Sequence, residues 1–199
     1  MTSRRVFGWF YRLGFTPWDG QPVPPNLCAL IEGTADTPAL VPSTALDVGC
    51  GTGEIAVYLA RHGWRVTGVD FVDQPLRAAR DRAAAAGVDV DFLRADVTRL
   101  SADGVGGGFG LIVDAGCLHN MPARSRDDYA REITAAAAPG ALLIVVGFPP
   151  KTQRGVPGLT DDELRRRLSP FWDLRSQWER STERGPLRDY MLMRTAAQS

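Results

Sequence analysis

The sequence predicts an α/β fold: one doubly wound, mostly parallel sheet of seven strands, with an antiparallel C-terminal hairpin and an N-terminal helical lid. Three observations predict it. From Ala45 onward, short apolar runs alternate with alanine-rich helical segments, as in strand–helix–strand units on a parallel sheet. Glycines gather where the first apolar run meets the first of these helices. With 199 residues, the chain has room for one domain with one sizeable core.

The first half of the predicted sheet contains two helices with recognisable ends. Residues 54–61 form a helix closed by Gly63, because glycine readily adopts the left-handed conformation found at helix ends. Asp73 is expected to cap a second helix, which stops at Gly87. The strands expected around these helices are residues 45–48, 65–70 and 88–95.

The second half of the sheet begins after a glycine-rich loop at residues 103–108, which suits neither a helix nor a strand. A helix is expected over residues 127–138, ended by Pro139 and Gly140. The strand that follows is almost continuously hydrophobic, which is typical of a sheet covered on both faces. The two strands expected here are residues 109–115 and 141–148.

Both ends of the chain differ from this repeating core. Thr160 and Glu163 form a capping box that opens a helix through Leu168, and two strand-like runs follow as a terminal hairpin. An amphipathic helix and a proline-rich stretch begin the chain, before a helix from Pro25, and they are interpreted as a cover over the sheet. The N-terminal helix face comprises Val6, Trp9, Phe10 and Leu13, and the hairpin strands are residues 171–178 and 187–194.

The composition is that of an ordinary globular domain without a strong electrostatic field. Lys plus Arg equal Asp plus Glu at 23 each, so we expect a small-molecule partner, no nucleic acid and no membrane. Three cysteines without a C-x-x-C pair or a secretory leader favour the cytoplasm. A single domain, either monomeric or homodimeric, is expected. Its parts are the helical cover 1–44, the core 45–148, and the loop, helix and hairpin 149–199.

The glycine loop lies where a strand gives way to a helix, so a ligand can approach bare backbone beside a helix N-terminus. The nicotinamide-dinucleotide pattern G-x-G-x-x-G requires its last glycine where this chain has Glu54. The carboxylate of Asp47 would repel a diphosphate but attract a ligand that carries an ammonium and a sulfonium. The glycines of the loop are Gly49, Gly51 and Gly53.

Two further acids follow the next two strands. Asp70 ends the second strand, where an acid in a doubly wound sheet can accept both hydroxyls of a ribose. Asp96 ends the third strand, where it can accept the exocyclic amine of an adenine, with Val97 as apolar cover for the ring. Each acid alone is as readily a helix cap or a turn residue. Their joint placement favours an adenosine site.

These motifs resemble those of the class I S-adenosylmethionine-dependent methyltransferases, and the resemblance covers roughly residues 45–148. It implies that family's Rossmann-like fold, S-adenosyl-L-methionine as cofactor and S-adenosyl-L-homocysteine as product. The glycine loop would hold the methionine part, Asp70 the ribose, and Asp96 with Val97 the adenine. The residues expected to bind the cofactor are Asp47, Gly49, Cys50, Gly51, Gly53, Asp70, Phe71, Asp96, Val97, Ala115 and Trp18.

The segment Gly14–Asp19, followed by prolines, is similar to the N-terminal segment of the thiopurine, thiol and halide methyltransferase group. Tellurite-resistance-type methyltransferases are similar in size. The resemblance implies that Trp18 lies over the cofactor and shields the transferring methyl from water, whereas a plain core tryptophan is the alternative. The unaltered glycine loop departs from the plant halide enzymes and disfavours halide as the acceptor.

His119 is the candidate catalytic residue. It follows the fourth strand, at the carboxyl edge where open α/β sheets bind ligands, and an imidazole there can accept a proton or orient the acceptor. A structural histidine at the start of a helix is the alternative. The neighbouring Cys117 is expected to be a buried packing residue. No set of His, Cys, Asp and Glu has the spacing of a metal site, so no metal is expected.

The sequence therefore predicts an enzyme that methylates a small-molecule nucleophile, such as a thiol, a phenol or a quinol. Two alternatives belong to other classes. One is a NAD-dependent oxidoreductase, which would need a loop compatible with pyrophosphate. The other is a non-catalytic module that binds S-adenosylmethionine as a sensor or scaffold.

Overall fold

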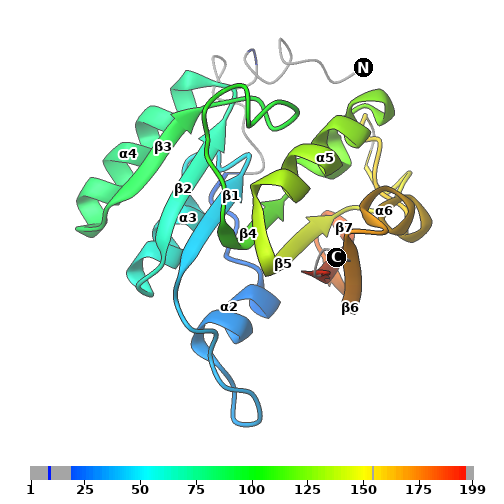
Figure 1. Ribbon diagram of the computed structural model, residues 1–199, viewed down its shortest axis with the longest axis horizontal. Helices are drawn as coiled ribbons and strands as arrows, with labels where there is room; N and C mark the ends of the chain where they lie inside the picture. Colours follow the sequence, from blue (N-terminus) through cyan, green and yellow to red (C-terminus); the bar gives the residue numbers. More distant parts are fainter. Residues whose placement is uncertain (1–8, 10–18, 154, 196–199) are drawn as a thin grey trace.

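The computed structural model describes Trp9 and residues 19–153 and 155–195, and these form one seven-stranded sheet with helices on both faces (Figure 1). The strand order is β3-β2-β1-β4-β5-β7-β6. The strands are β1 Thr44–Val48, β2 Arg65–Asp70, β3 Val90–Arg94, β4 Phe109–Ala115, β5 Ala137–Gly147, β6 Trp172–Thr182 and β7 Gly185–Arg194. The helices are α2 Pro25–Glu32, α3 Glu54–Arg61, α4 Asp73–Ala86, α5 Arg126–Ala136 and α6 Asp161–Leu168, with short 3₁₀ turns η1 Leu118–Asn120 and η2 Ala123–Ser125.

The predicted fold class is confirmed. Strands β3, β2, β1, β4 and β5 pair in parallel, whereas β7 pairs antiparallel with both β5 and β6. The order of the strands reverses at β1, which lies between β2 and β4. In open α/β sheets, ligands bind beyond the carboxyl ends of the strands at such a point. The fold therefore predicts a ligand site beyond the carboxyl ends of β1, β2 and β4.

The core has two layers because successive side chains of a strand point to opposite faces of the sheet. On β4, Leu111 and Val113 pack with α2, α3 and α4, whereas Ile112 packs with α5 and α6. All three side chains are fully buried. This burial on both faces explains why the strands read as continuous apolar runs in the sequence.

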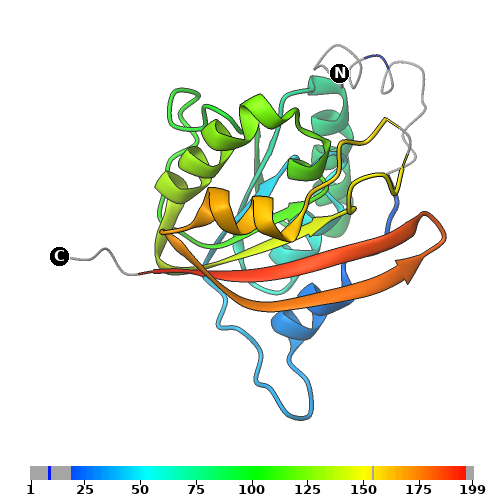
Figure 2. The same ribbon diagram turned by 90° about the vertical axis from the view of Figure 1, so that its right-hand side faces the viewer.

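The C-terminal hairpin lengthens the sheet and reaches past its carboxyl edge. Strand β7 pairs with β5 from Gly147↔Arg188 onward, and the β6–β7 turn lies between Thr182 and Gly185. Figure 2 shows the hairpin as a long orange and red ribbon whose turn projects beyond the end of β5, on the same side as the loop that follows β5. The hairpin tip and this loop thus meet at the edge where ligands are expected.

Several predicted boundaries were wrong. Helix α5 ends at Ala136, and β5 begins at once, so Pro139 and Gly140 lie inside the strand instead of ending the helix. The pairing of β4 with β5 shifts register between Phe109↔Ala137 and Leu111↔Leu142, and this irregularity accommodates the proline and the glycine. Both hairpin strands are longer than predicted and nearly meet at the turn.

The expected cap at Asp73 was also wrong. Val72 is the N-cap residue of α4, and Asp73 is the first helical residue, where its carboxylate lies 3.2 Å from the guanidinium of Arg94. By contrast, the capping box of α6 is confirmed, since the hydroxyl of Thr160 accepts a hydrogen bond of 3.1 Å from the backbone N–H of Glu163. A helix from Pro25 is confirmed as α2.

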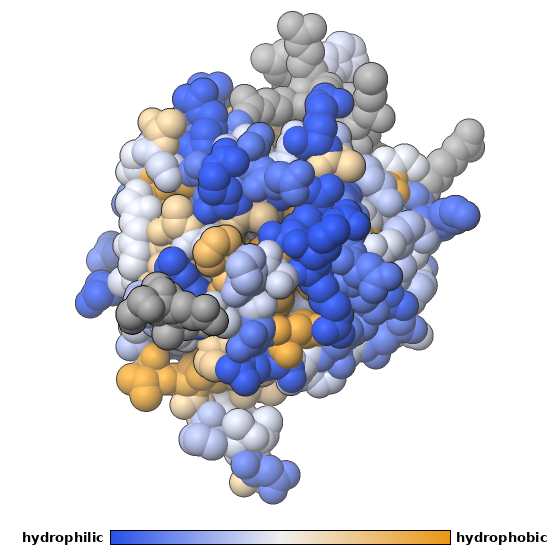
Figure 3. All heavy atoms as spheres, turned by 45° about the vertical axis from the view of Figure 1, so that its right-hand side comes forward, coloured by the Kyte–Doolittle hydropathy of each residue, from blue (hydrophilic) through white to orange (hydrophobic). Residues whose placement is uncertain are grey.

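The described surface is mostly hydrophilic. On the face shown in Figure 3, apolar side chains appear in small separate groups between blue hydrophilic ones. Large apolar side chains that stand out of the described surface are Trp9, Val41 and Phe171, and they come from distant parts of the chain. None of the described helices has the length and apolar character needed to cross a bilayer.

Candidate active site

The glycine loop joins β1 to α3 and is left-handed at each of its glycines. The φ angle is 68° at Gly49, 53° at Gly51 and 81° at Gly53, a region that residues with a Cβ rarely adopt. A Cβ on Gly53 would lie 2.9 Å from the Cβ of Ala79, and one on Gly49 would lie 3.1 Å from the Cβ of Cys117. Conformation and close packing therefore both require glycine, and the loop presents bare backbone at the end of β1.

Asp47 is a buried acid near the end of β1, with 2% of its surface exposed. Burial raises its pKa to about 7. The negative charges of Asp114, Glu54 and Asp70 also raise the pKa, whereas a hydrogen bond from the Ala56 backbone lowers it. Its Oδ2 has no hydrogen-bond partner among the described residues. Because a buried polar atom without a partner is unfavourable, this oxygen suits a ligand that brings a hydrogen-bond donor or a positive charge.

Asp70 ends β2 and holds the glycine loop. Its Oδ2 accepts a hydrogen bond of 3.2 Å from the Gly51 N–H, and its Oδ1 accepts one of 2.9 Å from the Val72 N–H. Burial raises its pKa to about 6, and the charge of Asp19, from the N-terminal segment, adds to this effect. Asp70 therefore fixes the shape of the loop as well as presenting a carboxylate at the strand end.

The ends of β2 and β3 are joined directly, because the Ala95 N–H donates to the Asp70 carbonyl at 3.0 Å. This bond brings Asp96, which lies two residues beyond the end of β3, beside the end of β2. The Asp96 side chain accepts from the Thr98 N–H at 3.1 Å and is half-buried. Val97 is 5% exposed and packs mainly in the core. Phe71, which follows Asp70, is half-buried at the same edge.

Asp114 organises the loop after β4 and was not singled out from the sequence. Its buried carboxylate accepts hydrogen bonds from the backbone N–H groups of Gly116, Cys117 and Leu118, at 3.1, 2.8 and 3.0 Å. The Tyr129 hydroxyl of α5 donates a fourth at 2.7 Å. An acid at the end of a strand, followed by small residues, was the available signal, because such an Asp commonly binds the backbone just beyond it.

His119 lies in η1, 5% exposed, at the carboxyl edge of the sheet. Burial lowers its pKa to about 4, so the imidazole is neutral at pH 7. Its Nε2 lies 3.0 Å from the Asn120 amide nitrogen, and because an amide nitrogen is a donor, Nε2 is the accepting nitrogen. Its Nδ1 has no hydrogen-bond partner among the described residues. The ring stands edge-on to Phe148, with 5.3 Å between centroids.

Comparison with known proteins agrees with this geometry. A family model described as a methyltransferase domain matches residues 45–140. The 2-heptyl-1-hydroxyquinolin-4(1H)-one methyltransferase of Mycobacteroides abscessus is 36% identical over 163 residues, which are 78% of this chain and 68% of that protein. The chain belongs to the class I S-adenosylmethionine-dependent methyltransferases. The cofactor and the enzyme class predicted from the sequence are thereby confirmed, and the nicotinamide alternative has no support.

Two other similar proteins extend the comparison. The demethylmenaquinone methyltransferase of Thermus thermophilus is 34% identical over 135 residues, 65% of this chain and 58% of that protein. A solved structure described as the conversion of a disulfide bond into a thioacetal group during echinomycin biosynthesis has a TM-score of 0.81 and 26% identity, and covers 98% of this chain and 94% of that one. The methyltransferase thus shares its fold almost from end to end with a solved protein.

The residues at the carboxyl edge fit S-adenosylmethionine. The buried Asp47 Oδ2 is matched to a cationic ligand, and the glycines of the loop place no side chain between the end of β1 and a ligand. The carboxylate of Asp70 lies at a strand end, the position from which an acid of a doubly wound sheet can bind a ribose. The acidic groups here would oppose a diphosphate.

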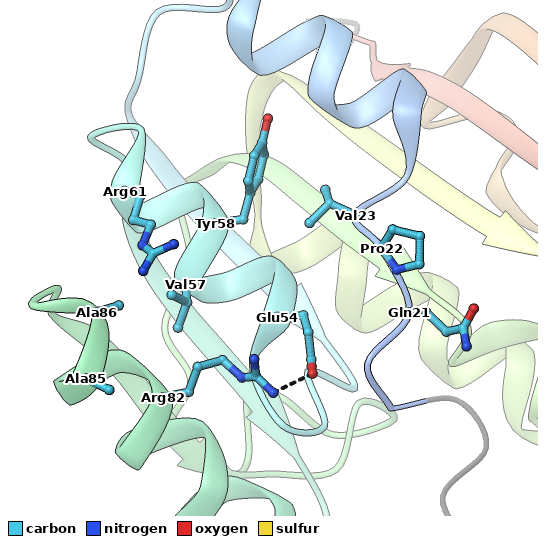
Figure 4. Close-up of a pocket in the computed structure, with 10 residues that line it drawn as sticks. All are labelled: Gln21, Pro22, Val23, Glu54, Val57, Tyr58, Arg61, Arg82, Ala85 and Ala86. Atoms are coloured by element: carbon cyan, nitrogen blue, oxygen red, sulfur yellow. Dashed lines mark hydrogen bonds and ion pairs between the residues drawn. The ribbon is translucent and has the colours of Figure 1, made fainter.

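The Glu54 carboxylate, whose charge also reaches Asp47, is itself bound by two partners. Its carboxylate binds the Arg82 guanidinium at 2.6 Å and the Thr52 hydroxyl at 2.9 Å. This ion pair is part of the lining of a hollow of about 440 Å³ between α3, α4 and residues 21–23 (Figure 4). The lining includes none of the acids Asp47, Asp70 and Asp96, so we assign the hollow no role in the methyltransferase reaction.

Cys50 and Ala115, two other residues predicted from the sequence, differ in their surroundings. Cys50 is 7% exposed, and its Sγ would lie 3.1 Å from a Cβ on Gly68, so its thiol faces the core while its backbone belongs to the loop. Burial raises the pKa values of both Cys50 and Cys117. Ala115, the last residue of β4, is exposed at the carboxyl edge.

Some residues that the sequence predicts as functional lie outside the described residues, and no metal was expected. Trp18 and most of the expected N-terminal helix face lie outside the described residues; Trp9, which is described, is helical and exposed. Among residues 19–153 and 155–195, no group of three or more His, Cys, Asp and Glu side chains is arranged to hold a metal ion.

Arg126 is a second residue that sequence reasoning missed. Its guanidinium is buried, binds the Glu163 carboxylate at 2.7 Å and donates to the carbonyls of Gly158 at 2.7 Å and His119 at 3.3 Å. It therefore fastens the loop after β5 to the 3₁₀ turn that carries His119. No local sequence pattern predicts this role, because Arg126 and Glu163 are far apart in the sequence.

Asp47→Asn is expected to change how stability depends on pH. Folding raises the pKa of Asp47 from 3.8 to about 7, so between these values the folded protein holds more protons than the unfolded chain. The free energy of unfolding therefore falls as the pH rises from about 4 to about 7. Since asparagine does not titrate, the variant should be the more stable protein at about pH 8, and this advantage should vanish near pH 4.

Urea unfolding of both proteins across this range measures the effect. Some fall with pH should remain in the variant, because the pKa of Asp70 is raised in the same direction. Isothermal titration at neutral pH should also show weaker binding of S-adenosylmethionine by the variant, since a negative charge beside the cation is lost. Curves for the two proteins that run parallel from acid to alkaline pH would show that Asp47 is not the titrating group.

Proposed function

We propose that this methyltransferase transfers the methyl group to a hydroxyl of an aromatic, fused-ring small molecule. The observation that carries the proposal is the 36% identity, over 78% of the chain, to an enzyme named for a hydroxyquinolinone acceptor. The similarity to a demethylmenaquinone methyltransferase also supports an aromatic, oxygen-bearing acceptor. Of the acceptors predicted from the sequence, the phenol and quinol class is therefore favoured over thiols.

The chemistry of the acceptor edge is consistent with an acidic hydroxyl. S-adenosylmethionine supplies the methyl group as a sulfonium and leaves as S-adenosylhomocysteine. The protein has to hold the acceptor in line with this group and exclude water, which contributes up to ~7–11 kcal/mol in favourable cases. With a pKa of about 4, His119 is a weak base, which is better matched to an aromatic hydroxyl that ionises readily than to an alcohol.

The residues at the carboxyl edge of the sheet are proposed to form a cofactor side and an acceptor side. The carboxylates of Asp47, Asp70 and Asp96 and the glycine loop are proposed to hold the cofactor. The turn after β4 and the loop after β5 are proposed to hold the acceptor, with His119 between them. The contact between Gly49 and Cys117 joins the two sides, because these loops touch at the end of β1.

A sulfur acceptor is the second candidate. A solved structure that is similar to this chain, with a TM-score of 0.81, concerns a conversion of a disulfide into a thioacetal. A thiol with a pKa near ~8.5 would also need little help from a base. The same screen separates the two candidates.

Incubation of the enzyme with S-adenosylmethionine labelled in its methyl group, and with matched sets of thiols, naphthols, quinols and 2-heptyl-1-hydroxyquinolin-4(1H)-one, tests the proposal. The expected result is label on oxygen, with kcat/KM at least about 10-fold higher for hydroxyarenes than for thiols. Preference for thiols by the same margin would reject the proposal in favour of a sulfur acceptor.

His119→Ala is expected to slow only acceptors that must lose a proton during the reaction. With 1-naphthol, which is protonated at neutral pH, kcat/KM should fall by about 100-fold, the usual effect of losing a general base. In that step Nε2 exchanges its hydrogen bond from the Asn120 amide for the naphthol hydroxyl. With 4-nitro-1-naphthol, which is already ionised, kcat/KM should change little, and binding of S-adenosylhomocysteine should stay intact. An equal loss with both naphthols would instead assign His119 a structural role.

A further inference from the structure

His119 is fixed in place by the loop after β5 and by the end of that strand. Its backbone carbonyl accepts hydrogen bonds from the Gly158 N–H at 3.0 Å and from the Arg126 guanidinium at 3.3 Å. Its ring lies against Gly147, where an added Cβ would be 3.3 Å from Nδ1, and edge-on to Phe148. The imidazole therefore has little freedom to turn, and its two nitrogens have different surroundings.

The Asn120 side chain links this ring to the loop after β4. Its amide nitrogen lies 2.7 Å from the Gly116 carbonyl oxygen and 3.0 Å from His119 Nε2. Because a carbonyl oxygen only accepts, the atom beside Gly116 has to be the amide nitrogen and not the amide oxygen. Gly116 is itself held, since its N–H donates to the Asp114 carboxylate. One N–H of the amide thus binds the loop, and the other binds the imidazole.

This contact decides which nitrogen of the imidazole carries the hydrogen. With a pKa of about 4, His119 is neutral at pH 7, so one ring nitrogen carries a hydrogen and the other a lone pair. Since an N–H of Asn120 points at Nε2, the lone pair is on Nε2 and the hydrogen is on Nδ1. The other tautomer would set two N–H groups against each other.

We propose that Asn120 is a positioning residue for the methyl transfer, which keeps His119 Nε2 unprotonated so that this nitrogen takes the proton of the acceptor hydroxyl. This inference rests on the proposed function and deepens it, since it names the residue that prepares the base. Because its other N–H is bound to Gly116, the Asn120 amide can give up Nε2 to the acceptor without leaving the loop. Asn120 thus acts through His119.

The proton of the acceptor follows a defined course. The O–H bond of the acceptor breaks, its proton goes to Nε2 to give an imidazolium, and the oxygen keeps the electron pair. That oxygen forms the new O–CH₃ bond while the sulfur–methyl bond breaks, and the sulfur keeps the electrons of the broken bond. The imidazolium then loses its proton to solvent, which its low pKa favours.

The tautomer of His119 can be observed directly, because the chain has two histidines. In protein labelled with ¹⁵N in its histidine rings, ¹H–¹⁵N correlation spectra separate protonated from unprotonated ring nitrogens. The signals that disappear in His119→Ala are those of His119. His62 is the internal control, since its Nδ1 donates to the Tyr58 carbonyl at 2.8 Å, and its signals should stay the same in every Asn120 variant.

Asn120→Asp and Asn120→Ala separate the contact with the imidazole from the contact with the loop. Both variants lose the N–H that binds the Gly116 carbonyl, but they differ at Nε2. Asn120→Asp places a carboxylate there, which only accepts, whereas Asn120→Ala leaves Nε2 without this partner. Gln177→Ala is the matched control, because it removes an exposed side-chain amide on β6 that donates to Asp161 at 3.0 Å.

At neutral pH, Nε2 of His119 should be unprotonated in the wild type and in Gln177→Ala. It should be protonated in Asn120→Asp, and Asn120→Ala should show both tautomers. With 1-naphthol, kcat should fall by about 100-fold in Asn120→Asp, as for loss of the base, and by about 10-fold in Asn120→Ala, where part of the protein keeps the reactive tautomer. With 4-nitro-1-naphthol, which is already ionised, kcat should change little in either variant.

The ionisation midpoint of His119, followed in the same spectra, is a second readout. Burial lowers the pKa of His119, the Val146 backbone raises it, and the charges of Arg126 on α5 and Arg184 at the hairpin turn lower it. Asn120→Asp adds a negative charge beside the ring, so the midpoint should move to higher pH. The shift should be smaller in Asn120→Ala, which adds no charge.

A protonated Nε2 in the wild type at neutral pH would overturn the inference, and so would the wild-type tautomer in Asn120→Asp. Equal losses of kcat with both naphthols would give Asn120 a structural role in the loop instead. Failure of the proposed function is recognised separately, because the wild type would then methylate no hydroxyarene in the acceptor screen. A wild type that methylates 1-naphthol, beside an Asn120→Asp variant that does so equally well, would reject the role of Asn120 alone.

Discussion

Replacing Asp70 with alanine is expected to lower the affinity for S-adenosylmethionine by about 100-fold or more, beyond detection in an ordinary titration. Two effects add. The variant loses the carboxylate that would hold the ribose, and it also frees the Gly51 and Val72 N–H groups that the carboxylate now fixes. The loop would then have to be ordered when the cofactor binds. Isothermal titration with S-adenosylmethionine and S-adenosylhomocysteine measures the loss.

Asp73→Ala is the matched control for this experiment. Asp73 lies three positions away, is 60% exposed and forms only a surface ion pair with Arg94. Its loss should change neither cofactor affinity nor stability by a measurable amount, because exposed ion pairs contribute little. Asp70→Asn should fall between the wild type and Asp70→Ala, because the amide keeps one acceptor oxygen. If Asp70→Ala bound S-adenosylmethionine with wild-type affinity, Asp70 would not be the residue that holds the ribose.

Asp114→Ala should have the largest effect on stability of any substitution at the site. The variant leaves three backbone N–H groups and the Tyr129 hydroxyl without their buried acceptor. We expect the free energy of unfolding to fall by about 3–5 kcal/mol, from hydrogen bonds to a charged group and from buried donors left unpaired. Urea unfolding at neutral pH, monitored by tryptophan fluorescence, measures the change.

Two further variants show whether this cost comes from the carboxylate. Tyr129→Phe removes one donor and should cost about 1–2 kcal/mol. Asp128→Ala changes an acid on the same helix as Tyr129, half exposed and paired with Arg131, and should cost less than about 1 kcal/mol. If the free energy of unfolding of Asp114→Ala fell by less than about 1 kcal/mol, the loop after β4 would not depend on Asp114.

The parallel part of the sheet could be predicted because each strand is buried on both faces and so forms a short apolar run between helices. The end of α5 could not. Pro139 and Gly140 usually end a helix, but here they lie in an irregular part of β5 whose pairing with β4 is set by the rest of the sheet. The hairpin was predicted too short, because the outer part of β6 alternates between half-buried and exposed residues and has little apolar signal.

The cofactor side of the site could be predicted because its parts are local. The geometry of a glycine loop, and of an acid at a strand end, is set by residues that are close together in the sequence. The acceptor side could not be predicted in the same way. Arg126 binds Glu163, and Arg184 binds Gln153, across separations of 37 and 31 residues. Neither arginine stands in a motif, so only the three-dimensional structure brings them to the carboxyl edge.

This difference has a physical meaning. The cofactor is common to the family, and its charges and shape can be met by one short loop and a few acids at strand ends. In the proposed function, the acceptor is met by the segments that follow β4 and β5, which depend on long-range packing. The residues around His119 and Phe148 are therefore where a close relative with another acceptor should differ.

A crystal structure of the protein with S-adenosylhomocysteine tests the central claim most directly. The account predicts the nucleoside across the ends of β2 and β3, with its ribose hydroxyls within hydrogen-bond distance of the Asp70 carboxylate and its adenine amine facing Asp96. The ammonium group of the homocysteine part should face Asp47 at the glycine loop. A nucleoside bound elsewhere, for example in the hollow between α3 and α4, with the ends of these strands in contact with solvent only, would contradict it.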